Sequence, residues 1–382
     1  MANSPDPQNL AVYIHWPYCA RICPYCDFNV YKQKSDLDLT KAILTGLSGW
    51  RNWSGPRNIT SIHFGGGTPS LMSAADIAKI IAHIKALWGL DNDCEIAIEA
   101  NPSDADEDKW VAYAKEGITR LSLGVQSFHE PALKLLGRDH GASQAKAACQ
   151  IARQIFSSIS FDLIFGWEGQ TQGLLNRDLE TALSYRPDHL SAYQLTIEPD
   201  TAFARSEARG QRKAVSDDLS AEFYEQVAKG LTAAAYHHYE VSNFAKAGHR
   251  SQHNLAYWRG QDYVGVGPGA HGRMTIDGQR FATIAALRPN DYIAAAQKEG
   301  LGLAEKEPLT AQGWGDEYVL MGLRIDEGIS LTRYQGITGQ RLPSETINTL
   351  TQEGYLVQNG DNLKASPKGR FVLNKITEEL LS

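Results

Sequence analysis

No stretch of the 382-residue chain is apolar for long enough to cross a bilayer, so we expect no transmembrane segment. The N-terminal segment Met1–Leu10 is polar, with prolines at positions 5 and 7, and lacks the hydrophobic region of a signal peptide. Cysteine is scarce: there are five, an odd number, and three of them fall within eight residues, which argues against a disulfide framework. Together these absences indicate a protein of the reducing cytoplasm.

An excess of positive charge is missing as well. The chain has 37 lysines and arginines against 44 aspartates and glutamates, a net charge of −7, and no basic cluster that would mark a nucleic-acid-binding surface. We therefore expect no nucleic-acid partner. Hydrophobic residues make up 42% of the chain, which is enough for a core, and the length predicts one large domain with a smaller second one.

Six short β-prone runs are each followed by a helical pattern, the alternation that gives parallel βαβ units. The runs are Ala11–Ile14, Ser61–Phe64, Cys94–Glu99, Arg120–Val125, Ser160–Phe165 and Leu190–Leu195. An open doubly wound sheet and a barrel can both hold such units. No G-x-G-x-x-G follows the first run, and the polar motifs described below stand at or just past the ends of the runs, as in barrel proteins. The sequence therefore predicts an α/β fold built on a partial (β/α)6 barrel.

The pattern changes beyond Ser242. We expect a Gly/His-rich loop over His249–Gly272, then a long helical stretch, and a linker at Glu305–Pro308. Helical patterns at Thr310–Leu323 and Ser344–Gln352 precede a hairpin signal, Asn359-Gly360-Asp361, so the C-terminal part reads as a small winged-helix-like domain. Because residues 301–382 hold more acidic than basic residues, we expect this domain to be structural or protein-binding. The expected division is 1–240, 241–304 and 305–382.

Three cysteines lie together after the first β-prone run, in Cys19-x3-Cys23-x2-Cys26. Thiolates at such spacing bind an iron–sulfur cluster or zinc. Three local ligands leave one coordination position open for a small molecule. A structural zinc site completed by a distant cysteine or histidine is the alternative, but no second cysteine pair is present, and the position after the first strand is where catalytic loops of barrels lie.

Further polar residues stand at the ends of the other predicted strands, just past them, or within one of them. Gly65-Gly66-Gly67-Thr68-Pro69 joins a strand to a helix capped by Ser73 and could bring backbone N–H groups close to a ligand. Arg138 could pair a carboxylate, and acidic or amide side chains could accept hydroxyl or ammonium groups. Those side chains are Glu99, Gln126 and Asp162. Each alone is equally consistent with a structural role; together they predict a pocket for a zwitterionic, ribose-bearing ligand.

The cysteine motif, with Tyr25 before its third cysteine, resembles that of the radical S-adenosylmethionine superfamily. Further segments resemble its HemN/HemW branch: Tyr13-Ile-His-Trp-Pro, Phe64–Pro69, Glu99-Ala-Asn-Pro102, Gly124-Val-Gln-Ser127 and Asp162-Leu-Ile. The resemblance implies a partial barrel of the radical S-adenosylmethionine type, a 4Fe–4S cluster on Cys19, Cys23 and Cys26, and S-adenosylmethionine on the fourth iron. It also implies cofactor contacts at Tyr13, Gly66, Gly67, Thr68, Glu99, Gln126, Arg138 and Asp162.

Two functions separate within this branch. Oxygen-independent coproporphyrinogen III dehydrogenases carry a further cysteine two residues after the third, where this chain has Phe28. Haem chaperones carry an H-N-x-x-Y-W signature, which His253-Asn254-Leu255-Ala256-Tyr257-Trp258 resembles. The resemblance thus implies a haem chaperone that delivers haem to apo-haem proteins such as respiratory enzymes, membrane-bound ones included, rather than a dehydrogenase.

The signature has a physical rationale, because an imidazole can ligate haem iron and flanking aromatic rings can stack on the macrocycle. We therefore expect haem contacts at His253, Tyr257 and Trp258. A histidine packed in a satisfied hydrogen-bond network is the alternative for His253. The axial ligand also stays open because other histidines lie near in sequence: His237, His238, His249 and His271.

Overall fold

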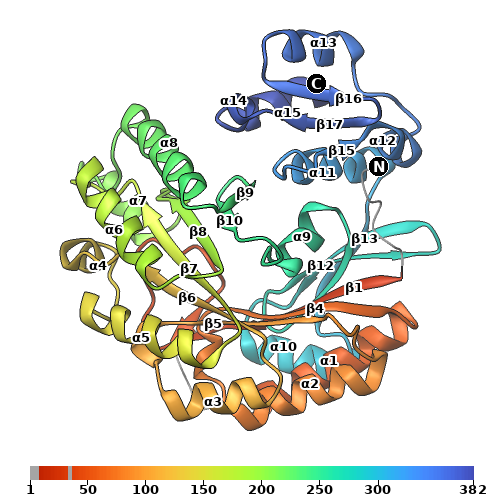
Figure 1. The fold of residues 1–382 in the computed structure, drawn as a ribbon. Coiled ribbons are helices and arrows are strands. Elements are labelled where there is room, and N and C mark those ends of the chain that lie inside the picture. The colour runs from red at the N-terminus through yellow and green to blue at the C-terminus, as the bar shows by residue number, and fades with distance from the viewer. Residues whose placement is uncertain (1–7, 33–36) are drawn as a thin grey trace.

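The computed structural model describes residues 8–32 and 37–382. The first seven residues of the polar N-terminal segment lie outside it, as does Asp36, where we expect the helical pattern after the first β-prone run to begin. The chain forms a large α/β body and a smaller C-terminal body, coloured blue in Figure 1, which packs near β9, β10 and α9. No helix in the described ranges is both long and apolar enough to span a membrane.

Six parallel strands form the centre of the large body. They are hydrogen-bonded in the order β1-β4-β5-β6-β7-β8, so each predicted run becomes a strand next to its predecessor. Their bounds are Asn9–Trp16, Asn58–Gly66, Glu95–Ala100, Arg120–Gln126, Ser158–Phe165 and His189–Gln194. Because β1 and β8 pair with other strands instead of each other, the barrel is partial, as predicted.

Helices cover the outer face of these strands (Figure 1). They are α1 (Leu37–Ser54), α2 (Ala74–Trp88), α3 (Glu107–Lys115), α4 (Glu130–Leu135), α5 (Ala142–Ile155) and α6 (Gln172–Ser184), with short 3-10 turns η1 (Pro69–Leu71) and η2 (Pro102–Asp104). The predicted start of α2 is confirmed, since Ser73 accepts a hydrogen bond from the Asp76 backbone and donates one to its carboxylate. The apolar stripes of these helices and the outward side chains of the strands form one core.

The inner face of the barrel is polar, unlike the outer face. Since side chains alternate along a strand, the register places one polar set on the inside of β4–β8. This set comprises Ser61, His63, Glu95, Glu99, Arg120, Ser122, Ser160, Asp162, His189 and Ser191. Most of these side chains bond to one another, such as Arg120 Nε to Glu95 Oε2 at 2.8 Å and Ser160 Oγ to His189 Nδ1 at 2.7 Å. The barrel interior is therefore suited to polar ligands at its mouth.

The predictions for residues 249–308 are wrong in part. Instead of a loop, a long helical stretch and a linker, the chain forms α9 (Gln252–Trp258), α10 (Pro289–Glu299) and four strands that extend the sheet beyond β1. These are β11 (Asp262–Val266), β12 (His271–Ile276), β13 (Gln279–Ala285) and β14 (Leu303–Pro308). The expected linker is the end of β14, an exposed and charged edge strand, and charge is how edges avoid further pairing.

β11 does not read as a strand in the sequence because it contains Gly265, and glycine is rare in strands. This glycine has a packing role. A Cβ on Gly265 would stand 2.0 Å from the carbonyl oxygen of His271, so only glycine lets β12 lie this close to β11. At the opposite edge of the sheet, β10 (Asn243–Ala245) and β9 (His237–Glu240) follow β8. Two helices, α7 (Ala202–Glu207) and α8 (Asp217–Ala233), connect β8 to β9.

The C-terminal body has its own core and the element order of a winged helix. Its elements are α11 (Ala311–Gly322), β15 (Ile329–Ser330), α12 (Leu331–Thr338), α13 (Ser344–Gln352), β16 (Leu356–Asn359), β17 (Asn362–Ala365), α14 (Pro367–Arg370) and α15 (Leu373–Leu381). The hairpin predicted around Gly360 is confirmed by the antiparallel pairing of β16 and β17. Division of the chain after residues 240 and 304 stays a proposal.

Ion pairs join this body to the barrel through the segment 324–327. Arg324 binds the buried Glu240 at 2.7 Å, and Asp326 and Glu327 bind Arg250 and Arg259 at 2.8 and 2.6 Å. Several charges in one network hold the two bodies more firmly than isolated surface pairs would.

A buried carboxylate, Asp262, ties β11 to the extension strands. It binds Arg280, which is 2% exposed, at 2.8 Å, and accepts hydrogen bonds from the backbone and hydroxyl of Thr275. Removing one partner leaves the other charge buried and under-compensated, so Asp262→Ala should lower the free energy of unfolding by about 3–5 kcal/mol. Chemical denaturation measures this loss. Lys298→Ala, which removes an exposed pair with Glu299, is the control and should cost less than about 1 kcal/mol; equal losses would contradict the role of Asp262.

Candidate functional site

The cysteine loop is fixed at both of its ends. Cys19 ends the two-residue strand β2 (Tyr18–Cys19), which pairs with β3 (Tyr31–Lys32). Within the loop, Cys26 N donates to Cys23 O at 3.2 Å, and the Pro24 carbonyl accepts from the backbone of Phe203 at 2.9 Å. Cys19 is buried, whereas Cys23 and Cys26 are half-buried. Burial raises the pKa of Cys19 and raises that of Cys26 to about 11, so these two thiols stay protonated until a metal displaces their protons.

The glycine loop lies directly against the cysteine loop. Gly67 N donates to Trp16 O at 2.7 Å and Thr68 N to Tyr18 O at 2.8 Å. A Cβ on Gly67 would stand 2.7 Å from Tyr18 O and 3.0 Å from Cys19 Sγ, and a Cβ on Gly66 2.6 Å from the ring of His15. Gly66 and Gly67 are therefore needed because His15, Tyr18 and Cys19 pack too close for a Cβ, whether or not a ligand also uses the space.

Arg138 stands between the cysteines and the strand ends. Its guanidinium donates to Cys23 Sγ at 3.4 Å and to Tyr25 Oη at 3.3 Å, and also to Asn101 Oδ1. Its Nε is buried and has no partner among the described residues. Arg138 thus brings positive charge to the sulfur atoms and keeps one donor unused, which fits its predicted pairing with a ligand carboxylate.

Two carboxylates occupy the inner wall of the barrel. Glu99 accepts from His63 Nε2 at 2.9 Å and from Gly66 N at 3.2 Å, and its side chain is still 37% exposed. Asp162 accepts from Ser122 Oγ at 3.2 Å, and burial raises its pKa to about 6. Both carboxylates keep lone pairs free for hydroxyl or ammonium donors.

A cavity of about 410 Å³ opens where these groups meet. The predicted site residues that line it are Cys19, Cys23, Cys26, Gly66, Gly67, Thr68, Glu99, Gln126, Arg138 and Asp162. Gln126 ends β6 with a φ of 63°, a left-handed backbone that a side chain adopts only under constraint from its surroundings.

The chemistry of this lining fits an iron–sulfur cluster beside a zwitterionic, ribose-bearing cofactor. Thiols, an unused arginine donor and two carboxylates line the same cavity. No three Cys, His, Asp or Glu side chains in residues 8–32 and 37–382 lie close enough to hold a single metal ion. In a cluster each thiolate binds a different iron, so its sulfur ligands stand farther apart than those of a single ion.

Four predicted site residues do not line this cavity. Tyr13 lies inside the barrel, where its hydroxyl meets His15 Nδ1 at 3.0 Å and its ring stacks on His63 and His253. Tyr257 packs edge-on against Tyr263, and Trp258 lies under the guanidinium of Arg324. His253, on α9, is the fourth.

His253 is only 1% exposed and both of its ring nitrogens have partners. Nδ1 lies 3.0 Å from Ser61 Oγ and Nε2 lies 2.6 Å from Tyr257 Oη, while the ring stacks on His63 at 4.8 Å. This is the satisfied network that the sequence left open as an alternative. Contact of His253 with haem stays a prediction.

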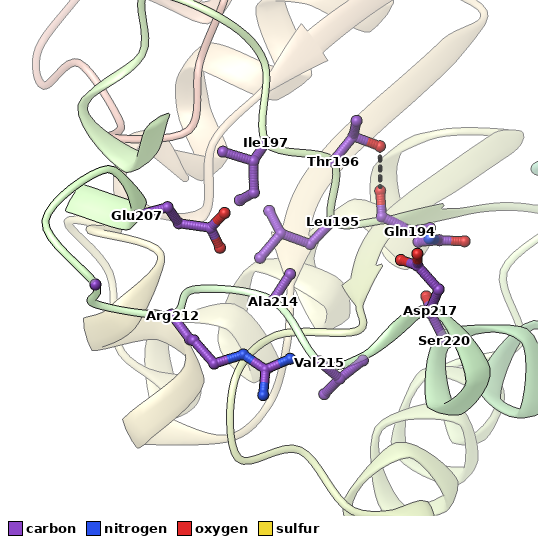
Figure 2. A pocket seen from close by; sticks show the side chains of 11 residues that line it. Gln194, Leu195, Thr196, Ile197, Glu207, Arg212, Ala214, Val215, Asp217 and Ser220 are labelled. Carbon is purple, nitrogen blue, oxygen red and sulfur yellow. Dashed lines mark hydrogen bonds between the residues drawn. The ribbon is translucent and has the colours of Figure 1, made fainter. Parts of the chain in front are cut away.

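A second pocket, of about 370 Å³, adjoins the first (Figure 2). Gln194, the last residue of β8, and the next two residues, Leu195 and Thr196, line both pockets. Glu207 and Arg212 flank its other side, from the end of α7 and the loop beyond it. The end of β8 is therefore the wall between the two spaces.

Sequence reasoning missed several residues of the site. Asn101 holds Arg138 and Thr68, His63 holds Glu99, and Ser122 holds Asp162, while Tyr193 lines the cavity. A signal was present, because polar residues recur at alternate positions in strands that are otherwise apolar.

Gly67→Ala tests the close approach of the two loops. The added Cβ would meet backbone atoms that cannot move aside, so the variant should lose about 1–3 kcal/mol of stability and bind less iron on anaerobic reconstitution. Iron per chain and visible charge-transfer absorption measure the loss. Gly336→Ala, within α12 and with nothing within 4 Å of its Cβ, should keep both values. If Gly67→Ala also kept the iron content and the absorption, the close approach of the two loops would be refuted.

Asp162 should make stability depend on pH in a defined window. Its pKa rises from 3.8 to about 6 on folding, so between these values the folded chain holds a proton that the unfolded chain has lost. Its contribution to the unfolding free energy should therefore fall by about 1.4 kcal/mol per unit as pH rises through the window, and stay constant above it. Asp162→Asn should remove this slope. A difference between the two proteins that stays the same from pH 4 to 7 would exclude the raised pKa.

Comparisons with known proteins agree with this geometry. The radical SAM superfamily matches residues 13–182, and the HemN C-terminal domain matches residues 309–372. The coproporphyrinogen III oxidase HemN of Escherichia coli has the same fold, with a TM-score of 0.82 over 99% of this chain and 91% of that one, at 21% identity.

Sequence similarity to other proteins is higher. "Heme chaperone HemW" of Haemophilus influenzae is 35% identical over 384 residues, and that of Escherichia coli 35% over 382, with 98% of both chains covered in each case. A mitochondrial radical S-adenosyl methionine domain-containing protein 1 of Bos taurus is 35% identical, over 99% of this chain and 89% of the relative. Identity at this level over nearly the whole length shows that the chain belongs to the HemW family within the radical SAM superfamily.

Proposed function

We propose that this protein is a haem chaperone that binds haem and transfers it to apo-haem proteins. The observation that carries the proposal is the identity of about 35%, over nearly the full length of both chains, to proteins described as haem chaperones. The cofactors of the radical SAM superfamily, a 4Fe–4S cluster and S-adenosylmethionine, fit the cysteine loop and the cavity beside it. When both are bound, the cluster can supply an electron to S-adenosylmethionine.

The chain's own residues would have separate tasks. The three cysteines hold the cluster, Arg138 offers Nε to the carboxylate of the cofactor, and Glu99 and Asp162 accept from its hydroxyl and ammonium groups. The acceptors that we propose are respiratory haem proteins, membrane-bound ones included. Five free thiols and an oxidation-sensitive metal loop suit the reducing cytoplasm.

Coproporphyrinogen III dehydrogenation is the second candidate, and the fold shared with HemN favours it. Against it stands Phe28, which occupies the place of the dehydrogenases' additional cysteine and is 62% exposed at the cavity rim. A phenyl ring cannot supply the ligand or hydrogen donor that a thiol could.

Anaerobic reconstitution followed by haem titration of the same sample tests the proposal. We expect haem to bind in a defined stoichiometry with a shifted Soret band, and to move to a haem-free b-type cytochrome when the two are mixed. Serum albumin loaded with haem is the control for passive release. Decarboxylated product from coproporphyrinogen III, with no haem transfer, would establish the dehydrogenase instead.

A further inference from the structure

Large apolar side chains are exposed around the mouth of the cavity. Of the seven that the described residues contain, three line the cavity: Ile22, Phe28 and Tyr193. A fourth, Leu287, is 57% exposed, and its carbonyl accepts hydrogen bonds from the side chains of Asn29 at 2.8 Å and Tyr31 at 3.2 Å. We call Ile22, Phe28 and Leu287 the rim patch.

One histidine near this patch has an unused imidazole. Of the eleven histidines in the chain, all within the described ranges, only His237 and His271 are exposed. His237 binds Asp326 at 2.6 Å. The ring of His271 makes no hydrogen bond or ion pair to any described residue. Burial and the nearby Arg273 lower its pKa, which favours the neutral form that ligates iron.

Asn29 connects the start of β12, where His271 stands, to the rim patch. The Asn29 amide donates to Pro268 O at 3.0 Å as well as to Leu287 O, and a Cβ on Gly269 would stand 2.4 Å from its Nδ2. The Asn29 carbonyl lies 3.0 Å from His15 Nε2, and His271 is near enough to His15 to lower its pKa. Phe28, Leu287 and the start of β12 are therefore neighbours.

Two arginines flank the patch, while Asp27 precedes Phe28 and Glu305 lies near His271. Arg21 precedes Ile22 and Arg288 follows Leu287; both are exposed, and neither forms an ion pair with a described residue. An apolar face, a free imidazole and two flexible cations are the groups that a flat iron porphyrin with two propionates needs.

We propose that haem docks on the rim patch with His271 as its axial iron ligand and with Arg21 and Arg288 near its propionates. This site rests on the proposed chaperone function and locates its cargo. It differs from the H-N-x-x-Y-W motif, whose His253 is buried with both nitrogens bonded. Because Phe28 is two residues from Cys26, haem bound there would lie beside the cluster loop.

Haem titration of His271→Ala, His253→Ala and His237→Ala tests the assignment. His271→Ala should weaken haem binding roughly tenfold or more and lose the electron paramagnetic resonance signature of nitrogen-ligated ferric haem. His237→Ala, the exposed control with its own carboxylate partner, should keep both the affinity and the signature, and His253→Ala compares the buried histidine with His271 directly. Iron per chain and the thermal unfolding midpoint verify that each variant is folded.

A second pair of variants separates the ligand from the apolar contact. Phe28→Ser with Leu287→Ser should weaken binding but retain the nitrogen signature, since the imidazole remains. Wild-type binding that survives His271→Ala and is lost in His253→Ala would overturn the site while the chaperone function stands. Failure of the wild-type protein to bind haem at all would overturn the proposed function and the site together.

Discussion

The contact on which the site depends is the one between the glycine loop after β4 and the start of the cysteine loop. Two backbone hydrogen bonds, Gly67 N to Trp16 O and Thr68 N to Tyr18 O, fix the loops at a separation that leaves no room for a Cβ. Since β1 and β4 are neighbouring parallel strands, their ends already lie side by side. The sheet supplies the alignment, and glycine allows the final approach that brings the Cys19 sulfur to the cavity.

Behind this contact, a chain of polar side chains connects the cavity to α9. Glu99 holds His63, His63 stacks on His253, and His253 bonds to Ser61 and Tyr257. Buried networks of this kind hold their members rigidly only while every partner is present. The H-N-x-x-Y-W motif therefore has a structural task in this arrangement: it fixes the carboxylate wall of the cavity from behind.

The parallel barrel could be predicted from the sequence because its strands are short β-prone runs with clear stops, such as Asn101-Pro102 after β5. The extension β11–β14 could not, because Gly265 lowers the strand signal of β11 and the charges of β14 imitate a linker. Residues at strand ends, such as Glu99 and Gln126, could be expected to line one cavity, since parallel strands end at one edge. The burial of Tyr13 and His253 could not be predicted, because a sequence motif does not tell which of its side chains face the interior.

The two histidines, His253 and His271, differ in what iron ligation would require of them. His253 has exchanged water for two hydrogen bonds, so offering a nitrogen to iron would require breaking at least one of them and opening the barrel. Iron ligation by His271 would require neither change, because its side chain is exposed and its ring has no hydrogen-bond partner among the described residues. A chaperone must also release what it binds, and release is faster from an open patch with one imidazole than from a closed pocket, because the acceptor can approach the free face of the haem. The proposed site at the rim would thus meet both demands of haem transfer, binding through apolar contact and exchange through access.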